Sequence, residues 1–81
     1  MYCVYALKSK IANFYYKGFC QDLNKRLLQH NSGQTKSNKK YAPYEIVYTE
    51  EYIVIEDVLK REKYFKSAAG RRYLKNILTN K

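Results

Sequence analysis

One carboxylate in the second half of the chain interrupts the apolar face of the helix that is expected to carry it. The segment Val58–Phe65, VLKREKYF, has helical periodicity, and at about 100° per residue Glu62 projects from near the middle of an apolar stripe. The stripe consists of Ile55, Val58, Leu59, Phe65 and Ala69. A carboxylate that loses its hydration is costly unless it is paired with a cation or bound to a metal ion. Two explanations are open: Glu62 forms a structural ion pair, with Arg26 as the leading candidate, or Glu62 binds a metal.

Two further candidate functional side chains share one predicted helix in the first half of the chain. Asp22 is a suitable N-cap for a helix that runs to about Asn31, with Gly33 just beyond its end. Arg26 and His30 are four residues apart and flank the apolar stripe of this helix. A guanidinium and an imidazole at the border of core and solvent can reach a group bound alongside. The alternative for His30 is a partly exposed histidine that interacts with the C-terminal helix dipole.

The remaining elements follow from periodicity and turn residues. Alternating segments rich in β-branched and aromatic residues predict three strands, Tyr2–Lys8, Phe14–Cys20 and Tyr44–Tyr52. The five-residue SKIAN segment favours an antiparallel hairpin between the first two strands. Helical patterns predict Ile55–Lys66, with Gly70 as a C-cap, and a short last helix, Arg71–Leu78. The expected fold class is α+β, a small three-stranded antiparallel sheet flanked by helices in the order β-β-α-β-α-α.

Length and composition indicate one small folded domain, residues 1–81, with a strongly basic surface. The 81 residues include 16 Lys and Arg against 7 Asp and Glu, a formal net charge of +9. Such a charge attracts nucleic acid or an anionic membrane surface, although a solubilising lysine coat would also explain it. No signal peptide and no apolar run of about 20 residues is recognisable, so we expect a cytoplasmic protein without a membrane span. Cys3 and Cys20 are too few for a zinc ribbon or a disulfide framework; we expect buried thiols that lie close together if the first two strands pair.

Five segments, taken in order, carry a family resemblance. They are CVYAL around Tyr5, YKG beginning eleven residues later at Tyr16, DLNKRLLQHNSG, YEIVYTEEY and LKREKYFKS. Together they resemble the GIY-YIG nuclease superfamily, and they are most similar to its small single-domain members. The resemblance covers nearly the whole chain. Two positions depart from the pattern: Cys3 stands where the first motif often has Gly, and Lys17 replaces the central Ile of the second motif. An outward Lys17 adds a phosphate contact, whereas an inward Lys17 would disturb the site.

The resemblance implies a role for each candidate residue. Glu62 matches the family's metal-binding glutamate, which would hold Mg²⁺ or Mn²⁺ weakly until phosphate oxygens of the substrate complete its shell. Arg26 matches the arginine that contacts the scissile phosphate, and His30 matches a position that is frequently histidine. Tyr5 and Tyr16 match the tyrosines of the two name-giving motifs. We expect Tyr5 to act as general base, its pKa lowered from about 10 by nearby positive charge, with Tyr16 and His30 orienting water or phosphate. The sequence leaves open which of these three groups takes the proton.

The same resemblance implies a nucleic-acid substrate, with DNA as the first expectation. The lysines expected to contact its backbone are Lys17, Lys36, Lys39, Lys40, Lys60, Lys63 and Lys66. No module for reading base edges is recognisable, so we expect structure-directed specificity, for example for branched or damaged DNA in repair or recombination, or a partner protein that supplies it. The sequence does not define an oligomeric state. Two other functions remain open: a nucleic-acid-binding module with weak catalysis, and a basic surface protein that associates with ribosomes or anionic lipid.

Overall fold

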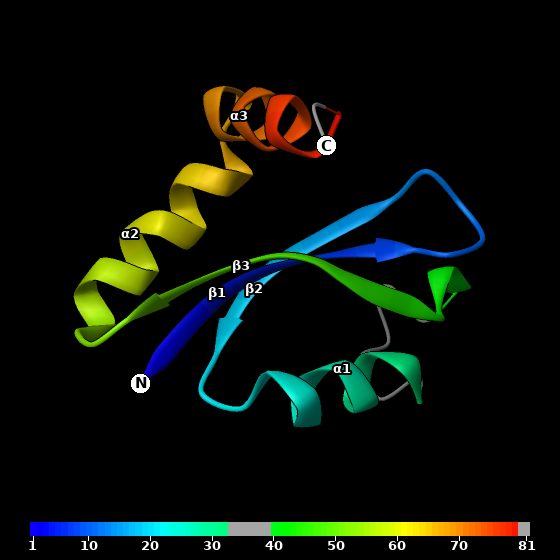
Figure 1. Cartoon of the computed structure of the whole chain (residues 1–81), viewed down its shortest axis with the longest axis horizontal. Helices are drawn as coiled ribbons and strands as arrows, with labels where there is room; N and C mark the ends of the chain where they lie inside the picture. The colour runs from blue at the N-terminus through cyan, green and yellow to red at the C-terminus, as the bar shows by residue number, and fades with distance from the viewer. Residues whose placement is uncertain (33–39, 80–81) are drawn as a thin grey trace.

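Three strands and three helices make up the part of the chain that the structure, a computed structural model, describes: residues 1–32 and 40–79 (Figure 1). The strands are β1 (Tyr2–Ser9), β2 (Tyr15–Cys20) and β3 (Tyr44–Tyr52). The helices are α1 (Leu23–Asn31), α2 (Ile55–Lys66) and α3 (Ala68–Thr79). The α+β class and the order β-β-α-β-α-α are confirmed.

The sheet is antiparallel with the order β2-β1-β3, so β1 is its central strand. Its four residues from Val4 to Leu7 are fully buried because both faces of the strand are covered. In the β1–β2 pairing Tyr5 lies opposite Gly18, and Leu7 lies opposite Tyr16. Because opposed residues share a face and side chains alternate along each strand, Tyr5 and Tyr16 lie on the same face of the sheet.

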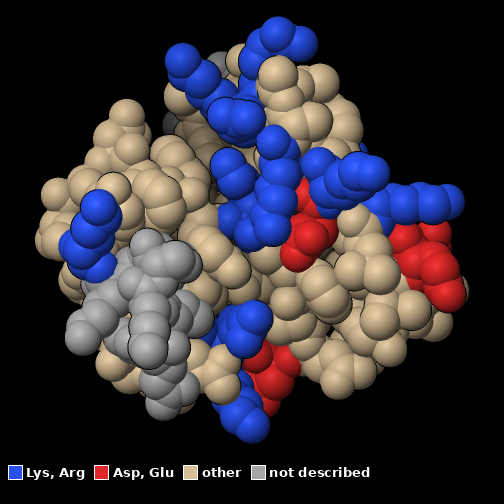
Figure 2. Space-filling model, turned by 180° about the vertical axis from the view of Figure 1, so that it is seen from behind, with Lys and Arg blue, Asp and Glu red and all other residues tan. Residues whose placement is uncertain are grey.

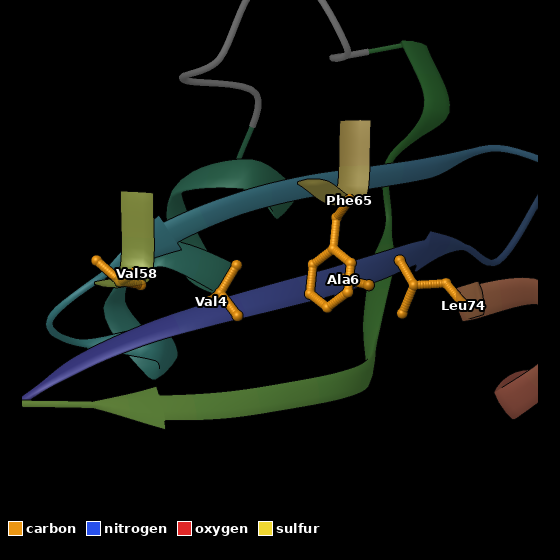
Figure 3. Packing of buried hydrophobic residues seen from close by; sticks show 5 residues of the cluster. All are labelled: Val4, Ala6, Val58, Phe65 and Leu74. Atoms are coloured by element: carbon orange, nitrogen blue, oxygen red, sulfur yellow. The ribbon is translucent and has the colours of Figure 1, made fainter. Parts of the chain in front are cut away.

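The helices cover the two faces of the sheet unequally. Figure 1 shows α1 on one face and the α2–α3 pair on the other. The core beneath α2 and α3 consists of Val4 and Ala6 from β1, Val58 and Phe65 from α2, and Leu74 from α3 (Figure 3). A second buried cluster on the α1 side consists of Tyr5, Leu7 and Tyr44. No helix among residues 1–32 and 40–79 is long and apolar enough to span a membrane.

The start of α1 is capped as the sequence predicts. The Asp22 side chain accepts a hydrogen bond from the backbone N–H of Lys25 at 3.1 Å. This bond satisfies one of the amide groups that have no partner within the first turn of a helix. Gly33, expected just beyond the end of α1, lies outside the described residues.

The prediction that Gly70 is a C-cap is wrong, because α3 begins at Ala68 and Gly70 lies in its first turn. The α2 helix ends at Lys66, and the Oγ of Ser67 accepts a hydrogen bond from the Gly70 N–H at 3.1 Å. A Cβ atom on Gly70 would lie 1.9 Å from the carbonyl oxygen of Tyr64. Glycine is therefore needed here because the first turn of α3 lies directly against the last turn of α2.

The buried face of α2 is narrower than the predicted stripe. Val58 and Phe65 are fully buried, whereas three other stripe residues, Ile55, Leu59 and Ala69, are exposed. Arg61 instead contacts the core from α2: its guanidinium lies 4.6 Å from the Phe65 ring centroid. The same guanidinium donates hydrogen bonds of 2.8 and 3.1 Å to the Glu50 carboxylate. These contacts join α2 to β3 and leave Glu62 at the edge of the core.

Candidate active site

Four of the predicted site residues meet between the sheet and α1. The hydroxyl of Tyr5, which is fully buried, lies 3.2 Å from Nε2 of His30 and accepts a hydrogen bond from Nε of Arg26 at 3.4 Å. The ring centroid of Tyr16 is 4.5 Å from that of His30 and 6.2 Å from that of Tyr5. We call this group of two tyrosines, one histidine and one arginine the Tyr5 cluster.

Gly18 makes room for the Tyr5 hydroxyl. A Cβ atom at Gly18 would lie 2.9 Å from the Tyr5 hydroxyl oxygen and 3.2 Å from the Tyr16 ring. Contacts this close would force the rings to move. The two-residue spacing from Tyr16 to Gly18 therefore has a steric reason. It places Tyr16 beside Tyr5 on one face of the sheet, and it places a residue without a side chain opposite Tyr5.

His30 lies deeper than the sequence predicts. It is fully buried, not at the border of core and solvent, and its ring is 5.9 Å from that of Tyr44, centroid to centroid. The next residue, Asn31, anchors this end of α1 to the start of β3: its Oδ1 accepts from the Tyr44 N–H at 2.6 Å, and its Nδ2 donates to the Tyr44 carbonyl at 3.3 Å. Sequence reasoning missed Asn31 and Tyr44 as supports of the site, although Asn31 is part of the KRLLQHNSG segment.

Burial is the largest cause of the pKa shifts of Tyr5 and His30. Burial raises the pKa of Tyr5 to about 12, although the hydrogen bond from Arg26 acts in the opposite direction. Burial lowers the pKa of His30 below its usual 6.5, and the charge of Arg26 lowers it further. The expectation that positive charge lowers the Tyr5 pKa is therefore wrong for the net shift. At neutral pH the structure pairs a neutral phenol with a neutral imidazole.

A groove of about 670 Å³ along the edge strand β2 brings Glu62 to the Tyr5 cluster. Its lining includes Tyr16, Gly18 and Arg26 from one side of the strand and Glu62 from α2 on the other. We call it the active-site groove. Tyr5 and His30 lie behind this lining, with the Tyr5 hydroxyl directly behind Gly18.

Glu62 is half-buried in this groove, with 21% of its side chain exposed. Its carboxylate lies 3.8 Å from the Nζ of Lys66 one turn later on α2. The alternative explanation of Glu62, an ion pair with Arg26, is not what the structure has: among the described residues Glu62 pairs with Lys66, and Arg26 lines the same groove without pairing with it. Because Lys66 is 53% exposed, this pair is weak and is easily rearranged.

The donors in the active-site groove fit a weakly held hard cation. Within residues 1–32 and 40–79, no three His, Cys, Asp or Glu side chains gather in a metal-binding cluster. Glu62 contributes one carboxylate in an open groove, where Mg²⁺ or Mn²⁺ would keep several water ligands. The residues present therefore suit an ion whose shell is completed by water and substrate oxygens, and Lys66 would have to move aside.

The predicted backbone-binding lysines are spread over the surface. Lys40, Lys60, Lys63 and Lys66 are exposed, and Lys36 and Lys39 lie outside the described residues. Lys17 is half-buried on the α3 side of β2, facing away from the Tyr5 cluster, so it does not disturb the site. Figure 2 shows Lys and Arg side chains in a band that runs from α3 at the top toward the centre of that face.

Cys3 and Cys20 lie directly opposite each other on β1 and β2, which confirms that they are close together. Both are free thiols and both are half-buried, less buried than the sequence predicts. Burial, followed by the neighbouring Cys3, raises the pKa of Cys20 to about 11. At neutral pH both sulfurs are therefore protonated thiols of low reactivity.

The fold and the groove define a small α+β domain in which a buried tyrosine–histidine pair lies behind an arginine and a glutamate. This chain belongs to the GIY-YIG family: the sequence profile of the GIY-YIG catalytic domain matches residues 1–75. It is 35% identical over 75 residues to a UPF0213 protein of Staphylococcus saprophyticus, covering 91% of this chain and 90% of that protein. The UPF0213 protein YazA of Bacillus subtilis is 32% identical over 69 residues, which is 84% of this chain and 69% of YazA.

The fold is also similar to a solved structure. The solution NMR structure of the UPF0213 protein BH0048 from Bacillus halodurans matches with a TM-score of 0.57 and 26% identity. The match covers 95% of this chain and 85% of that chain. The names of these relatives specify neither a substrate nor a metal, so the roles assigned below depend on the chemistry of the residues in this groove.

Proposed function

We propose that this chain is a divalent-metal-dependent endonuclease that hydrolyses phosphodiester bonds of DNA. The observation that carries the proposal is that Arg26 and Glu62 face one groove from two sides of the edge strand β2. A guanidinium is suited to a phosphate, and a carboxylate is suited to a hard cation. The Tyr5–His30 pair lies directly behind this groove, where it can receive a proton.

Arg26 is held in position to bind a phosphate. Its Nε donates to Tyr5 at 3.4 Å, and its Nη1 donates to the Gln29 side chain at 3.2 Å. These two contacts fix the plane of the guanidinium and leave donors on Nη2 for phosphate oxygens. Fixed, charged donors that face the developing charge are an effective form of transition-state stabilisation.

The attacking water is deprotonated through the Tyr5–His30 pair in this proposal. Tyr5 is too weak an acid to be a phenolate at neutral pH, because burial raises its pKa to about 12. Tyr5 is fully buried in this structure, so the proposal requires that one water pass Gly18 to its hydroxyl when substrate binds. The Tyr5 oxygen then takes a proton from that water as the Tyr5 hydroxyl proton passes to Nε2 of His30, 3.2 Å away. The hydroxide oxygen bonds to phosphorus, and the bond from phosphorus to the 3′ oxygen breaks. Tyr16, which lines the groove, orients the water or the phosphate.

Glu62 is the residue that would hold the metal. When bound there, Mg²⁺ or Mn²⁺ supplies positive charge that stabilises the departing 3′ oxygen. Exposed lysines such as Lys63 would contact the sugar–phosphate backbone without reading bases. We include in the proposal a cytoplasmic role in DNA repair or recombination, with specificity that comes from the shape of the substrate or from a partner protein.

The test is cleavage by wild type, Glu62→Gln and the control Glu56→Gln, which changes an exposed carboxylate on the same helix. Linear, nicked and branched DNA and RNA are each incubated with Mg²⁺, Mn²⁺ or a chelator. We expect wild type and Glu56→Gln to cut only with metal. Glu62→Gln should cut at least about 100-fold more slowly while it binds the same substrates.

Cleavage that Glu62→Gln leaves unchanged would contradict the assignment of the metal to Glu62. If wild type binds nucleic acid but cuts nothing under any of these conditions, the function is that of a nucleic-acid-binding module. Thermal unfolding of all three proteins shows whether a lost activity reflects the site or a lost fold.

A further inference from the structure

A second groove, of about 390 Å³, lies between the β1–β2 hairpin and α3. It opens on the side of the sheet opposite the Tyr5 cluster, and the catalytic steps proposed above use none of its residues. Its principal lining residues are Tyr15, Lys17, Arg71, Leu74, Lys75 and Leu78. We call it the β2–α3 groove. Its volume lies in the range of roughly 300–1,000 Å³ typical of small-ligand sites.

The charges around this groove repel one another and favour an anion. Lys17, Arg71 and Lys75 line it, and none of its described lining residues is acidic. Burial lowers the pKa of Lys17, and the charges of Arg71 and Lys66 lower it further. A bound phosphate would relieve this repulsion, because each ammonium or guanidinium would gain a counter-ion within the groove.

The remaining walls are apolar and aromatic. Leu74 and Leu78 come from one face of α3, and Tyr15 comes from β2. The Nζ of Lys8 lies 5.9 Å from the Tyr15 ring centroid, a cation–π contact that helps hold the ring in place. Inorganic phosphate has no apolar part that could contact these side chains. A cationic groove with an aromatic side chain is typical of sites for unpaired nucleotides, where bases stack on rings.

The β2–α3 groove adjoins the active-site groove at the edge strand β2. Lys17 lies between Tyr16 and Gly18, which line the active-site groove, and its side chain points to the other face. Lys66, close enough to shift the pKa of Lys17, is also the ion-pair partner of Glu62. A nucleic-acid strand that crosses β2 would therefore enter one groove as it leaves the other.

We propose that the β2–α3 groove binds an unpaired nucleotide next to the scissile phosphate, with its base against Tyr15, Leu74 and Leu78 and its phosphate against Lys17 and Arg71. The inference rests on the proposed function, because it takes the active-site groove as the place of cleavage. A base within a duplex has both faces stacked on its neighbours and cannot lie against Tyr15. The substrate therefore has an unpaired nucleotide beside the cleaved bond, and we propose that it is a duplex that carries a single-stranded tail or flap.

The test is binding, which needs no cleavage. The probes are one fluorescently labelled DNA duplex with blunt ends and the same duplex with a single-stranded thymidine tail, measured by anisotropy with Ca²⁺ in place of Mg²⁺. The variants are Tyr15→Leu, which keeps an apolar side chain but removes the ring, and Arg71→Gln. Arg72→Gln is the matched control, because Arg72 is the exposed neighbour of Arg71 on α3 and does not line the groove.

We expect wild type and Arg72→Gln to bind the tailed duplex about tenfold more tightly than the blunt one. Tyr15→Leu and Arg71→Gln should each reduce this preference about fivefold and leave affinity for the blunt duplex within about twofold. No preference for the tail in wild type, or a preference that both variants retain, would overturn the inference. Cleavage is measured separately, so the two proposals can fail independently. If the protein prefers the tailed duplex through Tyr15 but never cuts, nucleotide binding in the β2–α3 groove is supported and the proposed endonuclease activity is rejected.

Discussion

The Tyr5 hydroxyl has two polar neighbours, Nε2 of His30 at 3.2 Å and Nε of Arg26 at 3.4 Å. Both nearby groups could help it lose a proton, one by accepting the proton and the other through its charge. Burial nevertheless raises the Tyr5 pKa to about 12 and lowers the His30 pKa below 6.5. Acceptance of the proton by neutral His30 is therefore the step that makes Tyr5 useful as a base at neutral pH.

The pH dependence of cleavage should follow His30. The proposed mechanism needs an unprotonated Nε2 on His30 to accept the Tyr5 proton. Protonation of the imidazole removes that acceptor, so the rate should fall as pH decreases through the His30 pKa, which lies below 6.5. Between that pKa and neutral pH the imidazole is uncharged and the rate should be level. His30→Gln should slow cleavage about 100-fold or more and abolish the acid limb. Single-turnover rates between about pH 5 and pH 8 check this.

An acid limb that His30→Gln retains unchanged would assign the titration to another group. Tyr41→Phe is the control, because Tyr41 is an aromatic residue outside the active-site groove. Circular dichroism of both variants establishes that they are folded, which matters because His30 is fully buried.

At the scale of whole elements, the contact between α2 and α3 determines where Arg71 and Lys75 lie. The two helices meet at Gly70, where a Cβ atom would come within 1.9 Å of the Tyr64 carbonyl oxygen and 2.7 Å of the Phe65 Cα. Ser67 ends α2 and also caps the first turn of α3 through its hydroxyl. This tight junction holds α3 across the β1–β2 hairpin and so forms one wall of the β2–α3 groove.

Replacing Gly70 should therefore destabilise the protein. Gly70→Ala places a methyl group against backbone atoms that cannot rotate away, and we expect a loss of about 1–3 kcal/mol in the free energy of unfolding. In an ordinary helix interior the same change would stabilise by up to about 1 kcal/mol. Urea denaturation measures the difference. The control Ala69→Ser, an exposed position beside it, should change stability by no more than about 0.5 kcal/mol; an unchanged or raised stability for Gly70→Ala would contradict the steric account.

For the molecule as a whole, charge is the property with the longest range. The net charge is +9, and Figure 2 shows one face with a basic band and only separate acidic spots. A nucleic acid that crosses this face would meet the two grooves at the edge of β2 on its way. Nonspecific binding to the basic band is electrostatic and should therefore weaken with salt, whereas base stacking in the β2–α3 groove should depend on salt less.

Affinity for blunt duplex DNA should fall steeply with salt. Each neutralised phosphate contributes about 0.9 to the slope of log affinity against log salt concentration. Lys60→Ala combined with Lys63→Ala, two exposed positions on α2, should reduce that slope by about 1–2 without sequence preference. Lys10→Ala in the exposed hairpin turn serves as the control. An unchanged slope in the double variant would place the backbone contacts elsewhere on the molecule.

The sequence by itself determined the elements and their order. Alternation predicted β3, helical periodicity predicted α2 with both of its ends, and Asp22 marked the start of α1. These features depend on near neighbours in the chain, so a sequence can carry them alone. The motifs also named Tyr5, Tyr16, Arg26, His30 and Glu62, which the structure gathers around one groove, whereas their catalytic roles stay predictions.

The tertiary structure alone decided what depends on distant contacts. Strand register placed Gly18 opposite Tyr5 and turned Lys17 to the other face. Packing of α3 against α2 made Gly70 a point of close approach, although in sequence it is typical of a helix end. Burial reversed the predicted shift in the Tyr5 pKa, because desolvation depends on every segment that covers the hydroxyl. A sequence shows which groups are near in the chain, but only the folded chain determines how much water each one loses.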